Sequence, residues 1–291
     1  GAGAGAGGMR GGVVPISLNL NYTNVTARAS DLFEALGKLE GRLGALSLVG
    51  NAIGSDQLWR LLFHGKHLTL NTIFLKWEEW KPLLHNDLAN GVVLGDQLFA
   101  SALKQCAGLR ELHLGACKLL GSIAGDWIGD VMQACPRLES VKLGHNMLKD
   151  EGVKAMQRGL QSISRLSSLD LAGNYLGPAS ATLLVETLPR SCPLLLHLDL
   201  SSNFINCKDR DAAAAALART LPSFPSLGNL NLSSCEYSDQ DALALADALP
   251  LCTSLTRLGL EGHAFSEDTC KVLEQAAAAS PRLQCPFIRK S

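Results

Sequence analysis

The chain has 291 residues, a net charge of -1 and 47% hydrophobic residues, which is enough apolar material to bury a large core. Its 26 basic and 27 acidic residues form no long block of one sign, which argues against direct nucleic-acid binding through a broad basic surface. A membrane span needs about eighteen uninterrupted apolar residues, and the sequence contains no such window.

The chain begins with a glycine- and alanine-rich stretch, GAGAGAGGMRGG, at 1–12. We expect a flexible tail there, followed by one folded array over 13–291. The stretch lacks an initial Met and a secretory pattern, and is compatible with a cloning remnant, a processed end or a fragment boundary.

An eleven-position pattern, clearest as LSSLDLAGNYL at 166–176, recurs along nearly the whole chain. It reads leucine, two residues, leucine, one residue, leucine, two residues, asparagine, one residue, leucine. The first position of each copy falls at Pro15, Leu43, Leu70, Leu109, Leu138, Leu166, Leu195, Leu227, Leu255 and Leu283. Most intervals are 27 to 29 residues, and the exceptions are 39 and 32. This period predicts about nine to ten stacked units rather than several independent cores.

Each copy predicts a strand followed by a helix. The leucine-x-leucine core alternates at period two, which is typical of a short strand with one buried face. Helical spacing follows, as in the segment that begins at Ser238 and Asp239, two residues that suit a helix N-cap. Residues 212–221 are strong helix formers, and we expect three prolines to end helices: Pro189, Pro222 and Pro250.

Stacking places strand beside strand and helix beside helix. Because helices are bulkier than strands, the array must curve, with parallel strands on the concave face and helices on the convex face. The expected fold is therefore an α/β solenoid shaped like a horseshoe.

The copies LRELHLGACKL, LESVKLGHNML, LSSLDLAGNYL, LLHLDLSSNFI and LGNLNLSSCEY resemble leucine-rich repeats. The period of 28 to 29 residues, with a helix in each unit, is similar to the ribonuclease-inhibitor type, and the resemblance covers about 15–288. It implies a structural ladder in which the ninth residue of each copy bonds backbone groups of adjacent turns. The matching residues are Asn51, Asn146, Asn174 and Asn203, with Cys117 and Cys235 as the cysteine variant. Thr23 and His263 depart from the pattern, which favours looser or capping units at the two ends.

The nine cysteines do not form a small disulfide scaffold, and six of them follow the repeat, including Cys117 and Cys235 at the asparagine position. Four lie three residues before the first leucine of a copy: Cys106, Cys135, Cys192 and Cys252. Free, mostly buried thiols favour an intracellular, reducing compartment. We expect the cytoplasm first, with a cytoskeletal or organellar assembly as alternatives.

The longest interval contains an insertion near 76–93 that carries Trp77 and Trp80. One interpretation is a partner-binding loop, because exposed aromatic anchors dominate interfaces. The other is that both side chains cover an irregular joint between two blocks of repeats.

The residue between the second and third leucines should face out of the concave side. These residues are Asn19, Ser47, Phe74, His113, Lys142, Asp170, Asp199, Asn231 and Gly259. Neighbours in parallel strands lie about 4.8 Å apart, so Lys142, Asp170 and Asp199 would form a charged patch that attracts a basic partner group. The alternative is a solvated face without a dedicated ligand. The partner-binding candidates are Phe74, Trp77, Trp80, His113, Lys142, Asp170 and Asp199.

No motif predicts catalysis, a metal site or a cofactor. Gly3, Gly5 and Gly8 satisfy the GxGxxG spacing without a preceding strand, and His64 and His67 lack a matching Cys or Asp pair. The sequence contains no phosphate-loop motif, nucleophile elbow or triad pattern.

The sequence therefore predicts a non-catalytic protein-interaction module. It would be either a transient regulator or a subunit or adaptor of a multi-subunit complex that binds protein partners. The alternative is a GTPase-activating protein, because one such family is built from these repeats and acts through an arginine and asparagines on early loops. The early copies here are degraded and give no residue-by-residue match, so no site is assigned to that activity.

Overall fold

The computed structural model describes residues 16–19, 43–47, 72–74, 103–104, 108–115, 119–205 and 212–283. The predicted tail at 1–12 and the insertion at 76–93 lie outside these ranges. In β2 (Leu43–Ser47) and β3 (Thr72–Phe74) the description is limited to the backbone.

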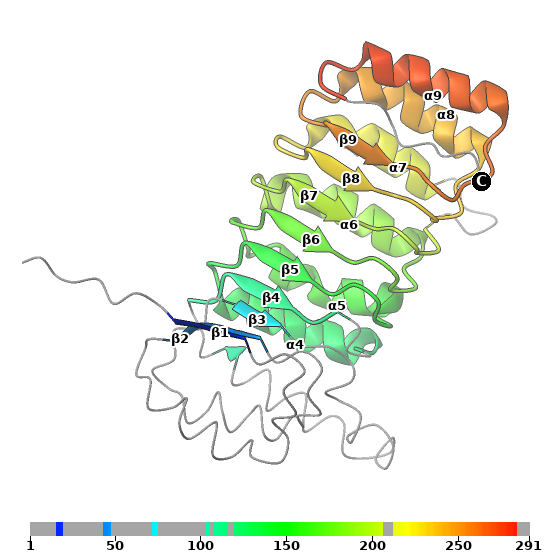
Figure 1. Cartoon of the computed structure of the whole chain (residues 1–291). Helices are drawn as coiled ribbons and strands as arrows, with labels where there is room; N and C mark the ends of the chain where they lie inside the picture. The colour runs from blue at the N-terminus through cyan, green and yellow to red at the C-terminus, as the bar shows by residue number, and fades with distance from the viewer. Residues whose placement is uncertain are drawn as a thin grey trace, which may run out of the picture.

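The described strands form one nine-stranded parallel sheet in sequence order. The first is β1 (Ile16–Asn19), and β2 and β3 follow it. The others are β4 (Glu111–His113), β5 (Ser140–Lys142), β6 (Ser168–Asp170), β7 (His197–Asp199), β8 (Asn229–Asn231) and β9 (Arg257–Gly259). Figure 1 shows the strands along one side of a curved array and the helices along the other. The predicted α/β solenoid is confirmed.

The leucine pattern builds the core. Each three-residue strand from β4 to β9 buries its central side chain and leaves its two outer ones less covered. The central residues are Leu112, Val141, Leu169, Leu198, Leu230 and Leu258, each at most 1% exposed. The other leucine positions, such as Leu166, Leu171 and Leu176, are also buried. Alternation at period two therefore fixes which strand residues remain available to a partner.

The helices of the described repeats cover the convex side. They are α4 (Gly121–Ala134), α5 (Lys149–Leu160), α6 (Pro178–Ser191), α7 (Ala212–Thr220), α8 (Asp239–Ala248) and α9 (Glu267–Ala279). The predicted N-cap is present, because the Ser238 hydroxyl accepts the Asp241 N–H at 3.3 Å and the Asp241 carboxylate accepts the Ser238 N–H at 2.8 Å. These reciprocal bonds satisfy two N–H groups that the helix leaves free.

The prolines differ in their effects. Pro222 and Pro250 lie in short 3-10 turns, η3 (Leu221–Ser223) and η4 (Leu249–Leu251), directly after α7 and α8. Pro189 does not stop α6, which continues to Ser191. Because this proline lies in the last turn, its missing N–H removes one bond near the helix end instead of breaking the interior.

Asparagine side chains join consecutive repeats. The Asn174 amide nitrogen donates to the Leu143 carbonyl of the preceding repeat at 2.9 Å, and its Oδ1 accepts the Leu148 N–H at 3.4 Å. Asn146 and Asn203 make the corresponding bonds, and all three side chains are buried. We call these three residues the asparagine ladder. They satisfy backbone groups that would otherwise be buried without partners.

Two other residue types occupy the ladder position near the C-terminal end. The Cys235 thiol donates to the Leu200 carbonyl at 3.1 Å. The ring of His263 lies with Nε2 2.9 Å from the Leu232 carbonyl oxygen, and Nδ1 accepts the Tyr237 N–H at 3.2 Å. This geometry requires the neutral tautomer with its proton on Nε2. His263, which departs from the pattern in sequence, therefore reproduces both halves of the asparagine bonding.

Acidic side chains cap helices of the following repeat. Asp150 Oδ1 accepts the N–H of Gly177 at 2.8 Å and of Ser180 at 3.1 Å at the start of α6. In the same way, Asp239 Oδ1 accepts the Ser266 N–H at 2.9 Å ahead of α9, a bond that lowers the pKa of Asp239. The first N–H groups of a helix have no acceptor within it, so these carboxylates link two repeats while they complete a helix end.

The helices α4 and α5 meet through glycine. A Cβ on Gly125 would lie 2.2 Å from the Gly152 carbonyl oxygen and 2.8 Å from the Ala155 Cβ. A Cβ on Gly159 would lie 2.6 Å from the Gly129 Cα. No side chain fits at these points, so the two helix backbones touch directly.

Candidate functional site

Two rows of strand positions, one on each side of the central leucine-type position, run along the concave side. The strand register aligns the first row: Asn19, Ser47, Phe74, His113, Lys142, Asp170, Asp199, Asn231 and Gly259. This is the row expected from the leucine spacing. The second row consists of Glu111, Ser140, Ser168, His197, Asn229 and Arg257.

Two carboxylates lie next to each other in the first row, and both accept hydrogen bonds from the chain itself. Asp170 Oδ1 accepts the Ala172 N–H at 3.0 Å. Asp199 Oδ1 accepts the N–H and the hydroxyl of Ser201 at 2.9 and 2.6 Å, and its Oδ2 accepts the Asn231 amide at 3.0 Å. Such bonds to residues two positions ahead form turns at the strand ends. Both aspartates therefore stabilise the turns that follow their strands and also lie on the concave surface.

Asp170 has spare capacity to bind a cation. Its Oδ2 makes no hydrogen bond within the described part of the chain. Burial raises the pKa of this carboxyl, the Ala172 N–H bond lowers it, and the neighbouring Asp199 raises it again. A partner ammonium or guanidinium group placed here would relieve the repulsion between the two carboxylates.

His113 is a neutral member of the row. Burial, and to a smaller extent the nearby Lys142 charge, lower its pKa to about 4. Its Nε2 lies 3.2 Å from the Ser140 hydroxyl and 3.7 Å from a Glu111 carboxylate oxygen. The Glu111 contact is therefore no ion pair at neutral pH.

A hollow of about 460 Å³ lies over β5 to β9 on the concave side. It is lined by residues of both rows, including Lys142, Asp170, Asp199, Asn231, His197, Asn229 and Arg257. Lys142 and Arg257 form no ion pair with any residue that the structure describes. The hollow therefore places Asp170 and Asp199 between Lys142 and Arg257, and Glu261, just after β9, adds a third carboxylate to its lining.

The second row was missed by the sequence interpretation, which took one outward position per strand. A three-residue strand with a buried centre turns both flanking side chains outward. The residue directly before the second leucine of each copy would have identified His197, Asn229 and Arg257.

Several predicted site residues fall outside the description. Phe74 has its backbone in β3, beside Ser47 and His113, and its side chain is not described. Trp77, Trp80 and the ladder candidates Asn51 and Cys117 lie outside the described residues. Their roles stay predictions.

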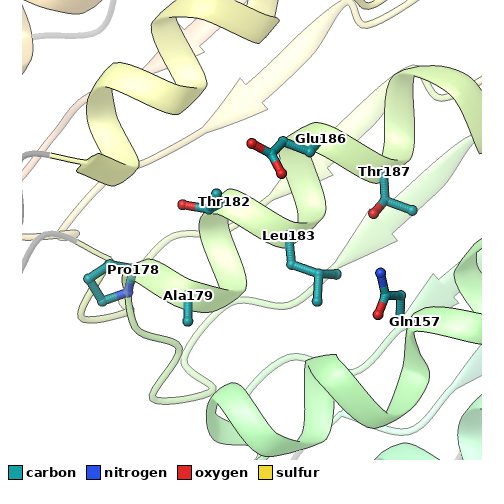
Figure 2. Close-up of a pocket in the computed structure, with 7 residues that line it drawn as sticks. All are labelled: Gln157, Pro178, Ala179, Thr182, Leu183, Glu186 and Thr187. Atoms are coloured by element: carbon teal, nitrogen blue, oxygen red, sulfur yellow. The ribbon is translucent and has the colours of Figure 1, made fainter.

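A second hollow, of about 470 Å³, lies on the convex side between α5 and α6. Figure 2 shows Leu183 and Thr187 of α6 pointing toward Gln157 of α5. Its one charged wall residue, Glu186, lies 3.8 Å from Arg219 of α7. We call this hollow the convex groove.

Among the described residues, no three His, Cys, Asp or Glu side chains are placed to hold a metal ion. No helix in the described ranges is both long and apolar enough to cross a membrane.

A solved structure with the same architecture decides the fold family. The leucine-rich repeat-containing protein LegL7 of Legionella pneumophila matches with a TM-score of 0.53 and 21% sequence identity, over 95% of this chain and 83% of that one. The chain has the leucine-rich-repeat fold. At this identity the match establishes the fold alone, which is the one indicated by the repeat and by the strand order.

Two curated mouse proteins resemble this leucine-rich-repeat chain in sequence. Tonsoku-like protein is 30% identical over 216 residues, which are 72% of this chain and 15% of that protein. Capping protein, Arp2/3 and myosin-I linker protein 2 is 27% identical over 210 residues, 59% of this chain and 16% of that protein. The chain thus spans about a sixth of the length of these relatives. No family model matches it.

Proposed function

We propose that this leucine-rich-repeat protein is a non-catalytic protein-interaction module that binds a protein partner on its concave side. The observation that carries the proposal is the hollow over β5 to β9, where both rows of polar side chains meet. Its two aspartates, Asp170 and Asp199, lie between Lys142 on β5 and Arg257 on β9.

The site is fixed before a partner arrives, which supports tight binding by a rigid surface. Asp199 is held by Ser201 and Asn231, and the strands beneath it are held by the asparagine ladder. Binding to such a surface loses little side-chain and backbone freedom. The ordering cost then falls mainly on the partner.

The charge pattern supports a partner with a basic centre. A lysine or arginine of the partner would donate charge-assisted hydrogen bonds to Asp170 and Asp199, which are stronger than neutral ones. Acidic groups on either side of that residue would face Lys142 and Arg257. The concave site would thus favour a partner segment in which a basic residue lies between two acidic ones.

We further propose that the chain works as a subunit or adaptor of a larger assembly, with the 76–93 insertion and its Trp77 and Trp80 as a second contact. Support comes from the relatives, in which the matched stretch is a small part of a long protein. One of them is named as a linker of capping protein, Arp2/3 and myosin-I. Size-exclusion chromatography in high salt tests this role, and a free monomer with only weak partners would contradict it.

The concave site is tested by quantitative affinity purification with matched variants. Asp170→Asn keeps an acceptor for the Ala172 N–H but removes the charge, and Arg257→Glu reverses a cation at the other side. Combining both should reduce recovery of specific partners by about tenfold or more. The control is Arg190→Glu, an exposed charge reversal on α6. Equal recovery of all proteins by the wild type, the concave double variant and the control would refute the concave site.

The GTPase-activating alternative gains no supporting observation from the described residues. A GTP hydrolysis assay with candidate GTPases remains its test, and an unchanged rate would eliminate it.

A further inference from the structure

A row of large apolar side chains lies exposed where the repeats turn from strand to helix. It consists of Leu120, Met147, Tyr175 and Phe204, whose exposed fractions are 41%, 38%, 51% and 46%. The last three each follow a residue of the asparagine ladder directly, so they hold the same position in consecutive repeats. We call this row the apolar ridge.

The members of the apolar ridge are spatial neighbours. Leu120 pairs with Met147 in a parallel bridge, and the Gly121 N–H donates to the Met147 carbonyl at 3.0 Å. The ring centroids of Tyr175 and Phe204 are 5.8 Å apart. Backbone bonding between repeats therefore continues along this edge, and places neighbours at about the sheet spacing of 4.8 Å.

The fold does not require apolar residues at the ridge. The residues after Met147, Tyr175 and Phe204, namely Leu148, Leu176 and Ile205, supply the core side chains and are buried. In the next repeat the equivalent position holds Glu236, which is exposed. Because a charged residue fits the same structural position, burial within this chain does not explain the apolar side chains.

We propose that the apolar ridge binds an amphipathic α-helix of a partner protein. A helix presents one side chain per turn of 5.4 Å along its axis, whereas an extended strand presents one per about 6.7 Å on a given face. Over the three intervals of the ridge, the helix departs from the 4.8 Å spacing by about 2 Å and the strand by about 6 Å. A helix can therefore place one apolar side chain beside each ridge residue.

Two charged residues near the ridge determine where the partner helix would carry charges of its own. The Lys149 N–H donates to the Asn174 carbonyl at 3.0 Å, so Lys149 flanks Tyr175. Glu236 continues the line of the ridge beyond Phe204. Neither has an ion-pair partner within the described ranges. The partner helix carries an acidic residue near its middle, opposite Lys149, and a basic residue at the end that reaches Glu236.

The test uses a labelled synthetic peptide with leucine at successive helical turns, a central glutamate and a terminal arginine. Fluorescence anisotropy measures its binding to the full chain. A second peptide carries two central prolines, and a third alternates apolar and polar residues as a strand does. We expect the helical peptide to bind at least about tenfold more tightly than either comparison peptide. Equal binding of the three peptides overturns the proposal.

Protein variants locate the peptide. Tyr175→Ser combined with Phe204→Ser should weaken binding about tenfold or more, since both side chains are large anchors. Leu251→Ser, at the most exposed apolar position of another element, and Arg190→Glu on α6 should leave binding unchanged. Peptide binding that survives the double change in a chain with an unchanged melting curve places the peptide elsewhere and overturns the proposal.

A charge exchange checks the assignment if the double variant is unstable. Glu236→Arg should weaken binding several-fold, and a peptide with glutamate in place of its terminal arginine should restore it. Failure of that restoration refutes the proposed orientation. Sedimentation of the chain alone provides the remaining outcome, because a dimer that Tyr175→Ser and Phe204→Ser dissociate would mean that a second copy occupies the ridge.

Discussion

The two helix joints on either side of α5 are built in opposite ways. Toward α4 the backbones touch, and a Cβ on Gly125 would lie 2.2 Å from the Gly152 carbonyl oxygen. Toward α6 the helices leave the convex groove of about 470 Å³, with Leu183 and Gln157 at its walls (Figure 2). The joint between α4 and α5 has no room for a side chain at Gly125, whereas the side chains between α5 and α6 leave a hollow.

The strand side of the same two joints is uniform. The register pairs Leu112 with Val141 and Val141 with Leu169 in the same way, and both joints have an asparagine ladder residue. The strands and the ladder therefore hold consecutive repeats together whatever the distance between helices. Since the strand spacing is constant, the spacing of the helices sets the local curvature of the array. The array should therefore be flatter at the joint between α4 and α5, which we call the glycine joint.

The largest expected effect comes from placing a methyl group in the joint between α4 and α5. Gly125→Ala should lower the free energy of unfolding by about 3 kcal/mol, because the new Cβ meets the Gly152 carbonyl and the helices must separate. Urea denaturation monitored by circular dichroism measures this change.

The joint between α5 and α6 provides the matched control. Ala179→Leu adds a larger side chain to the convex groove and should change the free energy of unfolding by no more than about 0.5 kcal/mol. Similar losses for Gly125→Ala and Ala179→Leu would show that the two joints do not differ in packing.

A smaller effect should be equal at the two joints. Asn146→Ala and Asn174→Ala each leave buried backbone groups without partners, and each should cost about 2 kcal/mol. Chemical denaturation of both variants tests whether the ladder acts independently of helix spacing. A much greater loss for Asn174→Ala, at the joint between α5 and α6, would show instead that helix contact also stabilises the joint between α4 and α5. No loss for either variant would count against the ladder.

The smallest effect distinguishes the histidine from the asparagines of the ladder. Burial lowers the pKa of His263, although its bond to the Leu232 carbonyl opposes this shift. The unfolded chain therefore binds a proton more readily, with a pKa near the ordinary 6.5. The contribution of His263 is fully present above that pH and is lost as the pH falls below it toward the lowered folded value.

Comparison with His263→Asn isolates this residue from other titrating groups. Asparagine restores the donor and acceptor without a titratable ring, so the difference in melting temperature between the variant and the wild type should grow in favour of the variant as the pH falls from 7 to 5. A constant difference across this range would mean that His263 protonation does not affect stability.

Local patterns account for what could be predicted. The first row on the concave side followed from leucine spacing, because alternation along a strand is a property of the backbone. The helix start at Ser238 and Asp239 followed from capping chemistry within four residues. The sequence interpretation missed the bonding of His263, since a ring that replaces an amide depends on where the Leu232 carbonyl and the Tyr237 N–H lie in space.

The sequence by itself determined the repeat, the α/β class and the concave row, because each depends on residues within one unit of 28 to 29. The tertiary structure decided the features that require two units to be placed against each other. These are the glycine joint, the convex groove, the cap of α6 by Asp150 and the apolar ridge. The physical reason is that the backbone pattern sets the structure of each repeat, whereas the volumes and charges that meet between repeats come from residues far apart in sequence.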